Sequence, residues 1–211
     1  MYILCMHAFA DADRHLLQSV ARLGYCNPFL PERVELERAI LGRDFTAGGP
    51  VWSPSVTDPE STRLTVPPIT RKVEEAVGRL RPIVASQAEL APEELRWYAE
   101  TVHYLLYHRY YPRFAGPGRQ TLYRDFLRDW NHLLRIPGRQ FEDPLEPGHL
   151  FACFRQIQRA FHAIYDHIIG NSMPAARLRA SIWQSIFTHD MRRYLRALFR
   201  RLGGFPPLIT G

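Results

Sequence analysis

The stretch PGHLFACFRQIQRAFHAIYDHIIG, residues 147–170, decides the fold class of this chain. Its apolar side chains recur three or four positions apart, which places them on one face of an α-helix. Pro147 suits the first turn of a helix, and Gly170 suits a C-terminal cap. The stretch therefore predicts a long amphipathic helix from about Pro147 to Ile169, with an inward face of Leu150, Phe151, Phe154, Ile157, Phe161, Ile164 and Ile168.

Helical spacing continues on both sides of this stretch. Upstream it predicts helices over about 16–23, 31–41, 69–85, 92–111 and 121–135, each bounded by Gly or Pro. Downstream, a long helical tract runs from about Pro174 to Leu202, with a break near Thr188. Leu208–Thr210 resembles a short strand that enters a turn. The predicted fold is mainly α: a helical bundle with a long C-terminal helical tract and at most one short strand.

One segment, residues 43–68, has no helical or strand period. It is rich in residues that break regular structure, namely Gly48, Gly49, Pro50, Pro54, Pro59, Pro67 and Pro68. A loop of this length is unusual inside a compact domain. We therefore expect the segment to be functional or to lie across the surface.

Composition is typical of a globular protein. Hydrophobic residues make up 46% of the 211 residues, so a core can form. No apolar run approaches the roughly 20 residues that a membrane span needs. Cys5, Cys26 and Cys153 are too few and too far apart for a disulfide framework, and they fit a reducing compartment. We expect a cytoplasmic protein that does not contact membranes.

Charge is distributed unevenly along the chain. Residues 1–105 carry 11 basic and 14 acidic side chains, whereas residues 106–211 carry 16 basic and 7 acidic ones. Such asymmetry can indicate a polyanionic partner. Lys72 is the only lysine, so the arginine bias also fits a GC-rich genome. Both interpretations stay open.

The C-terminal stretch IIGNSMPAARLRASIWQSIFTHDMRRYLRALFRRLGGFPPLITG, residues 168–211, resembles a known family. It is similar to the opening of the AAA+ ATPase domain of bacterial sigma-54-dependent transcriptional activators. In that family an I-I-G-x-S segment borders the adenine pocket, here Ile168, Ile169 and Gly170. A strand then ends in L-I-T-G, and its glycine, here Gly211, opens the Walker A loop. More loosely, NPFLPERVELERAILG, HYLLYHRYYPRF and HLFACFRQIQRAFHAIYDHIIG resemble the N-terminal region of one subgroup of these activators.

This resemblance implies two units: a helical regulatory domain over 1–167 and the opening of an AAA+ domain over 168–211. The chain has the first Walker A glycine but not the lysine that reaches the phosphates, so we expect it to be non-catalytic and without a cofactor. ATP and magnesium would bind the complete parent protein. An isolated strand at Leu208–Thr210 is marginally stable, so we expect a mobile or non-natively packed tail.

Other residue patterns have both functional and structural interpretations. Ile168–Gly170 can border adenine in the parent protein or simply end a core helix. Pairs four residues apart, His149 with Cys153 and His162 with Asp166, can present two metal ligands, but no third or fourth ligand follows at a recognisable spacing, so we predict no metal site. The tyrosine-rich stretch 97–111 can line a sensory pocket or form core. The arginine stripe can grip a polyanion or dock on a neighbouring domain, and it comprises Arg192, Arg193, Arg196, Arg200 and Arg201.

The resemblance to sigma-54-dependent activators implies a regulatory, dimerising domain that controls their AAA+ ATPase. Its partners would be the remainder of its own AAA+ domain and, through other domains, sigma-54 RNA polymerase and promoter-upstream DNA. The alternative is a stand-alone helical module that binds nucleic acid through its basic C-terminal half. The sequence identifies neither the regulatory signal nor the target genes.

Overall fold

The computed structural model describes residues 8–46, 59–86, 89–141, 145–170, 172–187 and 190–198. These residues are mostly helical and contain no strand, so the predicted mainly-α bundle is confirmed. Leu208–Thr210 lies outside them. The helices are α1 (Asp11–Leu23), α2 (Pro31–Leu41), α3 (Pro59–Ala85), α4 (Pro92–Tyr110), α5 (Arg119–Leu134), α6 (Pro147–His167), α7 (Met173–Ile186) and α8 (Met191–Arg193). Short 3-10 turns follow α2 and α4, at Gly42–Asp44 and Tyr111–Arg113.

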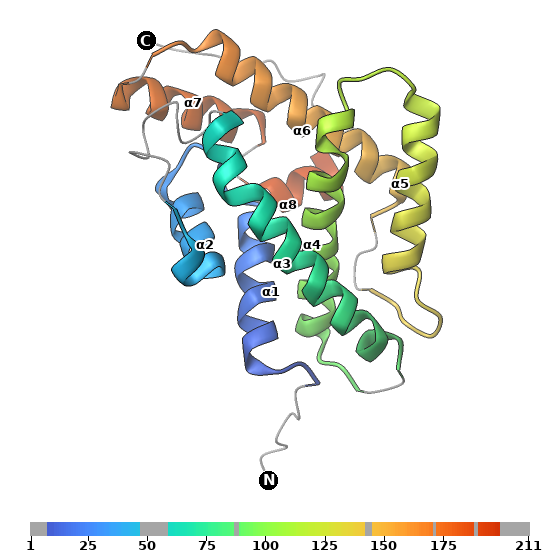
Figure 1. The fold of residues 1–211 in the computed structure, drawn as a ribbon. Coiled ribbons are helices and arrows are strands. Elements are labelled where there is room, and N and C mark those ends of the chain that lie inside the picture. Colours follow the sequence, from blue (N-terminus) through green and yellow to red (C-terminus); the bar gives the residue numbers. More distant parts are fainter. Residues whose placement is uncertain are drawn as a thin grey trace.

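Helix α4 is the central element of the bundle. It packs against α1, α3 and α5, and Figure 1 shows it crossed by α3. Burial on several sides explains why its apolar residues do not form a single narrow stripe. Tyr98, Val102, Leu105 and Leu106 are all at most 1% exposed. None of the helices in the described ranges is long and apolar enough to cross a membrane.

The N-terminus of α4 also binds the backbone of the residues that precede α1. Glu94 is fully buried there, and its carboxylate accepts hydrogen bonds from the backbone N–H groups of Ala8, Phe9 and Ala91 at 3.3–3.4 Å. A carboxylate at a helix N-terminus is stabilised by the helix dipole and by N–H donors. Glu94 therefore ties the segment before α1 to the central helix.

Two hydrophobic cores share helix α6. The larger core joins α1 to α5 with the first turns of α6, where Leu150, Phe151 and Phe154 are buried. The smaller core joins α6 to α7, α8 and the loop between α1 and α2. Its members are Phe29, Cys153, Ala160, Ile164, Ala180, Trp183, Phe187, Met191, Tyr194 and Leu195. Residues on both sides of position 168 thus share one core, while the domain boundary itself stays a prediction.

Helix α3 begins earlier than predicted. Residues 59–68 are helical, in contrast to the irregular segment expected over 43–68, and residues 47–58 lie outside the described part. The helix contains Pro67 and Pro68, which cannot donate to carbonyls one turn back. Thr70 Oγ1 donates to the carbonyl of Val66 at 2.8 Å. Full burial of Ile69 beside this site favours the helix despite the two missing bonds.

The C-terminal tract also differs in detail from the prediction. Helix α6 ends at His167 with Ile168 as its cap, so Gly170 lies two positions beyond the cap rather than at it. Helix α7 ends at Ile186, so the tract is interrupted where a break was predicted near Thr188. After α8 the backbone widens into a π-helical turn, Tyr194–Leu198, whereas an α-helix was expected.

Candidate functional site

The predicted adenine-edge segment, Ile168–Gly170, is held by a buried arginine of α7. Arg179 is 3% exposed, and its Nε and Nη2 donate to the carbonyl oxygen of Ile168 at 3.0 and 2.6 Å. Its Nη2 also donates to the carbonyl of Gly170 at 2.8 Å. The guanidinium lies 5.8 Å from the centre of the Tyr165 ring. These bonds satisfy carbonyls that the end of α6 leaves unpaired, and they fix the junction between α6 and α7.

The same junction exposes apolar side chains. Ile169 is 88% exposed, and Met173 and Leu178 nearby on α7 are 44% and 46% exposed. Gly170 has a φ of 131°, a backbone conformation that residues with a Cβ rarely adopt. Exposed large apolar residues can mark an interaction surface when they form one patch. The junction therefore combines a fixed backbone with an uncovered apolar edge.

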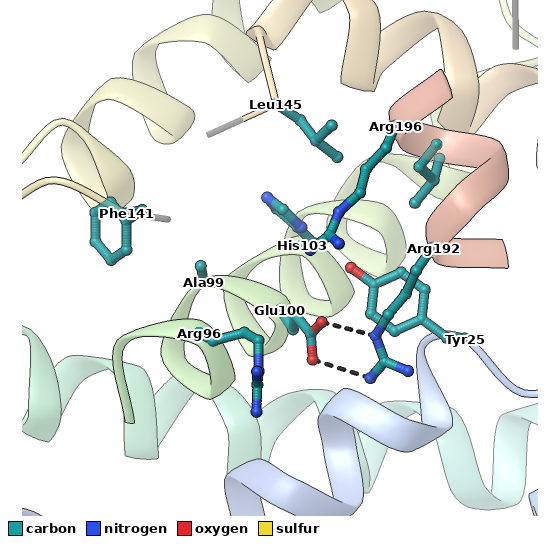
Figure 2. A pocket seen from close by; sticks show the side chains of 10 residues that line it. Tyr25, Arg96, Ala99, Glu100, His103, Phe141, Leu145, Arg192 and Arg196 are labelled. Atoms are coloured by element: carbon teal, nitrogen blue, oxygen red, sulfur yellow. Dashed lines mark hydrogen bonds and ion pairs between the residues drawn. The ribbon is translucent and has the colours of Figure 1, made fainter. Parts of the chain in front are cut away.

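A second candidate site is a cleft between α4 and the C-terminal segment (Figure 2). Five separate parts of the chain line it: α1, the loop after α1, α4, the loop before α6, and the segment from α8 into the π-helical turn. The inner recess is lined by Tyr25, Arg96, Ala99, Glu100, His103, Phe141, Leu145, Arg192, Leu195 and Arg196. The outer groove adds Gln18, Ala21, Arg22 and Trp97. We call these two parts together the arginine cleft.

An ion pair crosses the arginine cleft. Nε and Nη2 of Arg192 donate to the two carboxylate oxygens of Glu100 at 2.8 and 3.1 Å, as Figure 2 shows. The Glu100 side chain is 7% exposed and that of Arg192 is 41% exposed. The hydrogen bond to Glu100 raises the pKa of Arg192. The guanidinium also lies 4.3 Å from the centre of the Tyr25 ring, so it is fixed on two sides.

The described residues that line the cleft include more arginines than carboxylates. Arg96, Glu100 and His103 share one face of α4, at spacings of four and three residues. Glu100 is the only carboxylate among the described lining residues, against Arg22, Arg96, Arg192 and Arg196. Arg22 is neutralised by Glu32 at 2.8 Å, but Arg96 forms no ion pair with any described residue.

His103 contributes a buried polar atom to this cleft. The side chain is 8% exposed, and its Nδ1 has no hydrogen-bond partner among the described residues. Burial lowers the pKa of His103 to about 4, so the imidazole is neutral at physiological pH. Buried polar atoms are nearly always paired with protein or water. His103 Nδ1 is one of the exceptions, and it is shielded from solvent rather than open to the cleft.

The structure separates the members of the predicted arginine stripe. Arg192 and Arg196 line the cleft, whereas Arg193 is exposed and its backbone N–H donates to Asp190, which caps α8. Arg200 and Arg201 lie outside the described residues, as does Gly211. The stripe is therefore partly an intramolecular docking surface, because Arg192 binds Glu100 of α4.

The other candidate residues have packing partners. The Sγ atom of Cys153 lies 3.6 Å from Nε2 of His149. That Nε2 also lies 2.5 Å from the carbonyl oxygen of Leu195. His162 Nε2 lies 3.0 Å from the hydroxyl of Tyr111. No group of three or more potential metal ligands occurs in the described part of the chain. The tyrosine-rich stretch 97–111 mostly forms core, since Tyr98, Tyr104 and Tyr110 are at most 5% exposed.

Sequence reasoning missed most of the arginine cleft. One available pattern was the helical spacing of Arg96, Glu100 and His103, which places three polar residues on one face of α4. Tyr25 carried no such pattern, because a loop residue gains its role only through folding. Comparison with protein-family models, curated proteins and solved structures gives no significant match, so the resemblance to sigma-54-dependent activators rests on the residues quoted above.

Proposed function

We propose that this chain is the regulatory and interaction domain of a sigma-54-dependent transcriptional activator, which controls the AAA+ ATPase of the complete parent protein in the cytoplasm. The observation that carries the proposal is the motif Ile168–Gly170 at a fixed junction with an uncovered apolar edge. Ile169, Met173 and Leu178 would be covered by the rest of the AAA+ domain, where ATP and magnesium bind. RNA polymerase and promoter-upstream DNA would be contacted by other domains of the parent protein.

The proposed mechanism is a change in helix docking. Helix α8 is attached to α4 by the pair Arg192–Glu100 and to α6 through the smaller core. A signal that favours another position of α8 would act through α7 on the junction. Such a signal must bind the two arrangements with different affinity. In a dimerising domain, this change would free or block assembly of the ATPase ring.

The alternative, a stand-alone nucleic-acid-binding module, draws on the basic C-terminal half. Much of that charge is used inside the chain. In the described part of this half, at least six arginines bind carboxylates or backbone carbonyls of the same chain, namely Arg109, Arg113, Arg128, Arg139, Arg179 and Arg192. These contacts favour internal docking over a continuous phosphate-binding surface.

The gene sequence after codon 211 tests the proposal. We expect it to complete a Walker A loop with a lysine that contacts the phosphates and a hydroxyl residue that holds magnesium. A continuation without that lysine would contradict the proposal. Titration of the chain with duplex DNA at rising salt tests the alternative, because binding through phosphate contacts weakens steeply with salt.

A further inference from the structure

We propose that the loop between α1 and α2 is a latch that holds the last described part of the chain on the bundle. We call this part the C-terminal arm; it contains α7, α8 and the π-helical turn, at residues 168–170, 172–187 and 190–198. Tyr25, Asn27 and Phe29 of the loop form the latch. When their contacts break, the arm would detach as a unit while the larger core stays folded.

The C-terminal arm is connected within itself. Arg179 of α7 donates to the carbonyl oxygens of Ile168 and Gly170, which ties the junction to α7. At the other end of α7, the ring of Phe187 lies 4.8 Å from that of Tyr194, the first residue of the π-helical turn. Among the described helices, only α6 packs extensively against α7. Segments of this kind often open as one cooperative unit.

Phe29 is the apolar part of the latch. It is 5% exposed, and its ring stacks on Phe161 of α6 with 5.4 Å between centroids and 10° between planes. The Trp183 ring of α7 lies edge-on to it at 6.0 Å. Among the described buried members of the smaller core, Phe29 alone precedes α6 in the chain. The apolar attachment of the arm to the first two helices therefore depends mainly on this ring.

Asn27 is the polar part of the latch. Its Oδ1 accepts a hydrogen bond from the backbone N–H of Phe29 at 3.0 Å, which shapes the loop as an Asx turn. Its Nδ2 donates to the carbonyl oxygen of Ala180 in α7 at 2.9 Å. A helix carbonyl has two lone pairs, so this bond does not interrupt α7. One side chain thus fixes the loop and attaches it to the arm.

Tyr25 extends the latch to α8. The guanidinium of Arg192 lies 4.3 Å from the centre of the Tyr25 ring (Figure 2). The carboxylate of Glu100 binds the same guanidinium, so α4 contributes to the attachment of α8 as well. Within five residues, the loop therefore contacts α6, α7 and α8.

The latch is a property of this chain and does not rest on the proposed function. Its role as the place where a signal releases α8 and the junction does rest on that function. A signal that binds the attached and detached arrangements with different affinity would shift the population between them. The loop would then transmit the state of α1 and α2 to the arm.

Native-state hydrogen exchange of the whole chain tests the latch, because it measures the free energy of local opening. We expect the amides of α7 at 180–186 to be less protected than those of α4 at 102–106. Asn27→Asp keeps the acceptor that forms the turn but removes the donor to Ala180. It should raise the exchange rate in α7 by about threefold to tenfold, the effect of one hydrogen bond, and leave α4 unchanged. Phe29→Ala should raise it by about a hundredfold or more, because it empties a buried site.

Asn131→Asp is the matched control, because it makes the same chemical change on α5, a helix of the larger core. It should leave exchange in α7 as it is in the unmodified chain. The proposal is overturned if α7 and α4 are equally protected in the unmodified chain, if Asn27→Asp raises exchange equally in both helices, or if Asn131→Asp acts on α7 as strongly as Asn27→Asp. Circular dichroism checks that each variant keeps its helices. ATP hydrolysis does not enter this test, so its failure is distinct from failure of the proposed function.

Discussion

Arg192 and Glu100 are 92 positions apart in the chain, yet their side chains form a bidentate ion pair. Nε and Nη2 of Arg192 lie 2.8 and 3.1 Å from the carboxylate oxygens of Glu100. The pair joins the C-terminal segment to the central helix. Its carboxylate is buried, so it depends on Arg192 for compensation of its charge. A buried charge that loses its partner is costly, whereas an exposed pair contributes little.

Glu100→Ala should therefore destabilise the chain through loss of this contact. Because Arg192 is partly exposed and can be hydrated, we expect a loss of about 1–3 kcal/mol in the free energy of unfolding. Urea denaturation measures it. Arg128→Gln, an exposed substitution, should change the same quantity by less than about 0.5 kcal/mol. Equal effects of the two substitutions would argue against a structural role for the pair.

His103 should make the fold sensitive to acid. Its pKa is about 4 in the folded chain and about 6.5 when unfolded. Between these values the unfolded chain binds a proton that the folded chain does not, so stability falls as the pH is lowered from 6.5 to 4. The contribution is about 1.4 kcal/mol per pH unit. Denaturation of His103→Gln across this range should show a slope smaller by that amount; an unchanged slope would show that His103 is not buried as described.

The described cysteines should be inert to thiol reagents. Burial raises the pKa of Cys26 and of Cys153 to about 12. Because the thiolate is the reactive form, almost none is present at neutral pH. Cys5 lies outside the described residues, so the measurement uses the Cys5→Ser variant, in which this thiol cannot react. This variant should react with a chromogenic disulfide at neither remaining cysteine when folded, and at both in urea. Rapid reaction of the folded variant would contradict the burial.

Trp183 tests whether the C-terminal segment is part of the fold. It is 6% exposed and contacts Phe29 from the loop after α1 and Phe187, which caps the C-terminus of α7. Trp183→Ala should cost about 3–5 kcal/mol through the cavity it leaves, and Trp183→Phe should cost less. Chemical denaturation followed by circular dichroism gives both values. A negligible cost for Trp183→Ala would indicate that residues after 168 do not stabilise the bundle.

The parts of the fold that local rules control were predictable. Helices α4 and α6 start at Pro92 and Pro147 as expected, because proline suits the first helical turn and apolar spacing continues from there. The start of α3 could not be predicted, because burial of Ile69 stabilises a helix that two prolines locally disfavour. Tertiary packing regularly overrides local propensity in this way.

The candidate sites show the same limit. The junction at Ile168–Gly170 was recognisable because its residues are contiguous. The arginine cleft was not, since Tyr25, Glu100 and Arg192 come from three distant segments and no local spacing relates them. The π-helical turn that carries Arg196 has no sequence rule to predict it. A site built from residues that are distant in the sequence can be recognised only in the folded structure.

The central claim is that this domain controls an AAA+ ATPase through docking of α8 on α4. The most direct measurement is the ATP hydrolysis rate of the complete parent protein with and without Glu100→Ala, with Arg128→Gln as the control. The account predicts a several-fold change in rate for Glu100→Ala at unchanged ATP affinity, and none for Arg128→Gln. A rate that stays the same when the ion pair is removed, in a variant that is still folded, would contradict it.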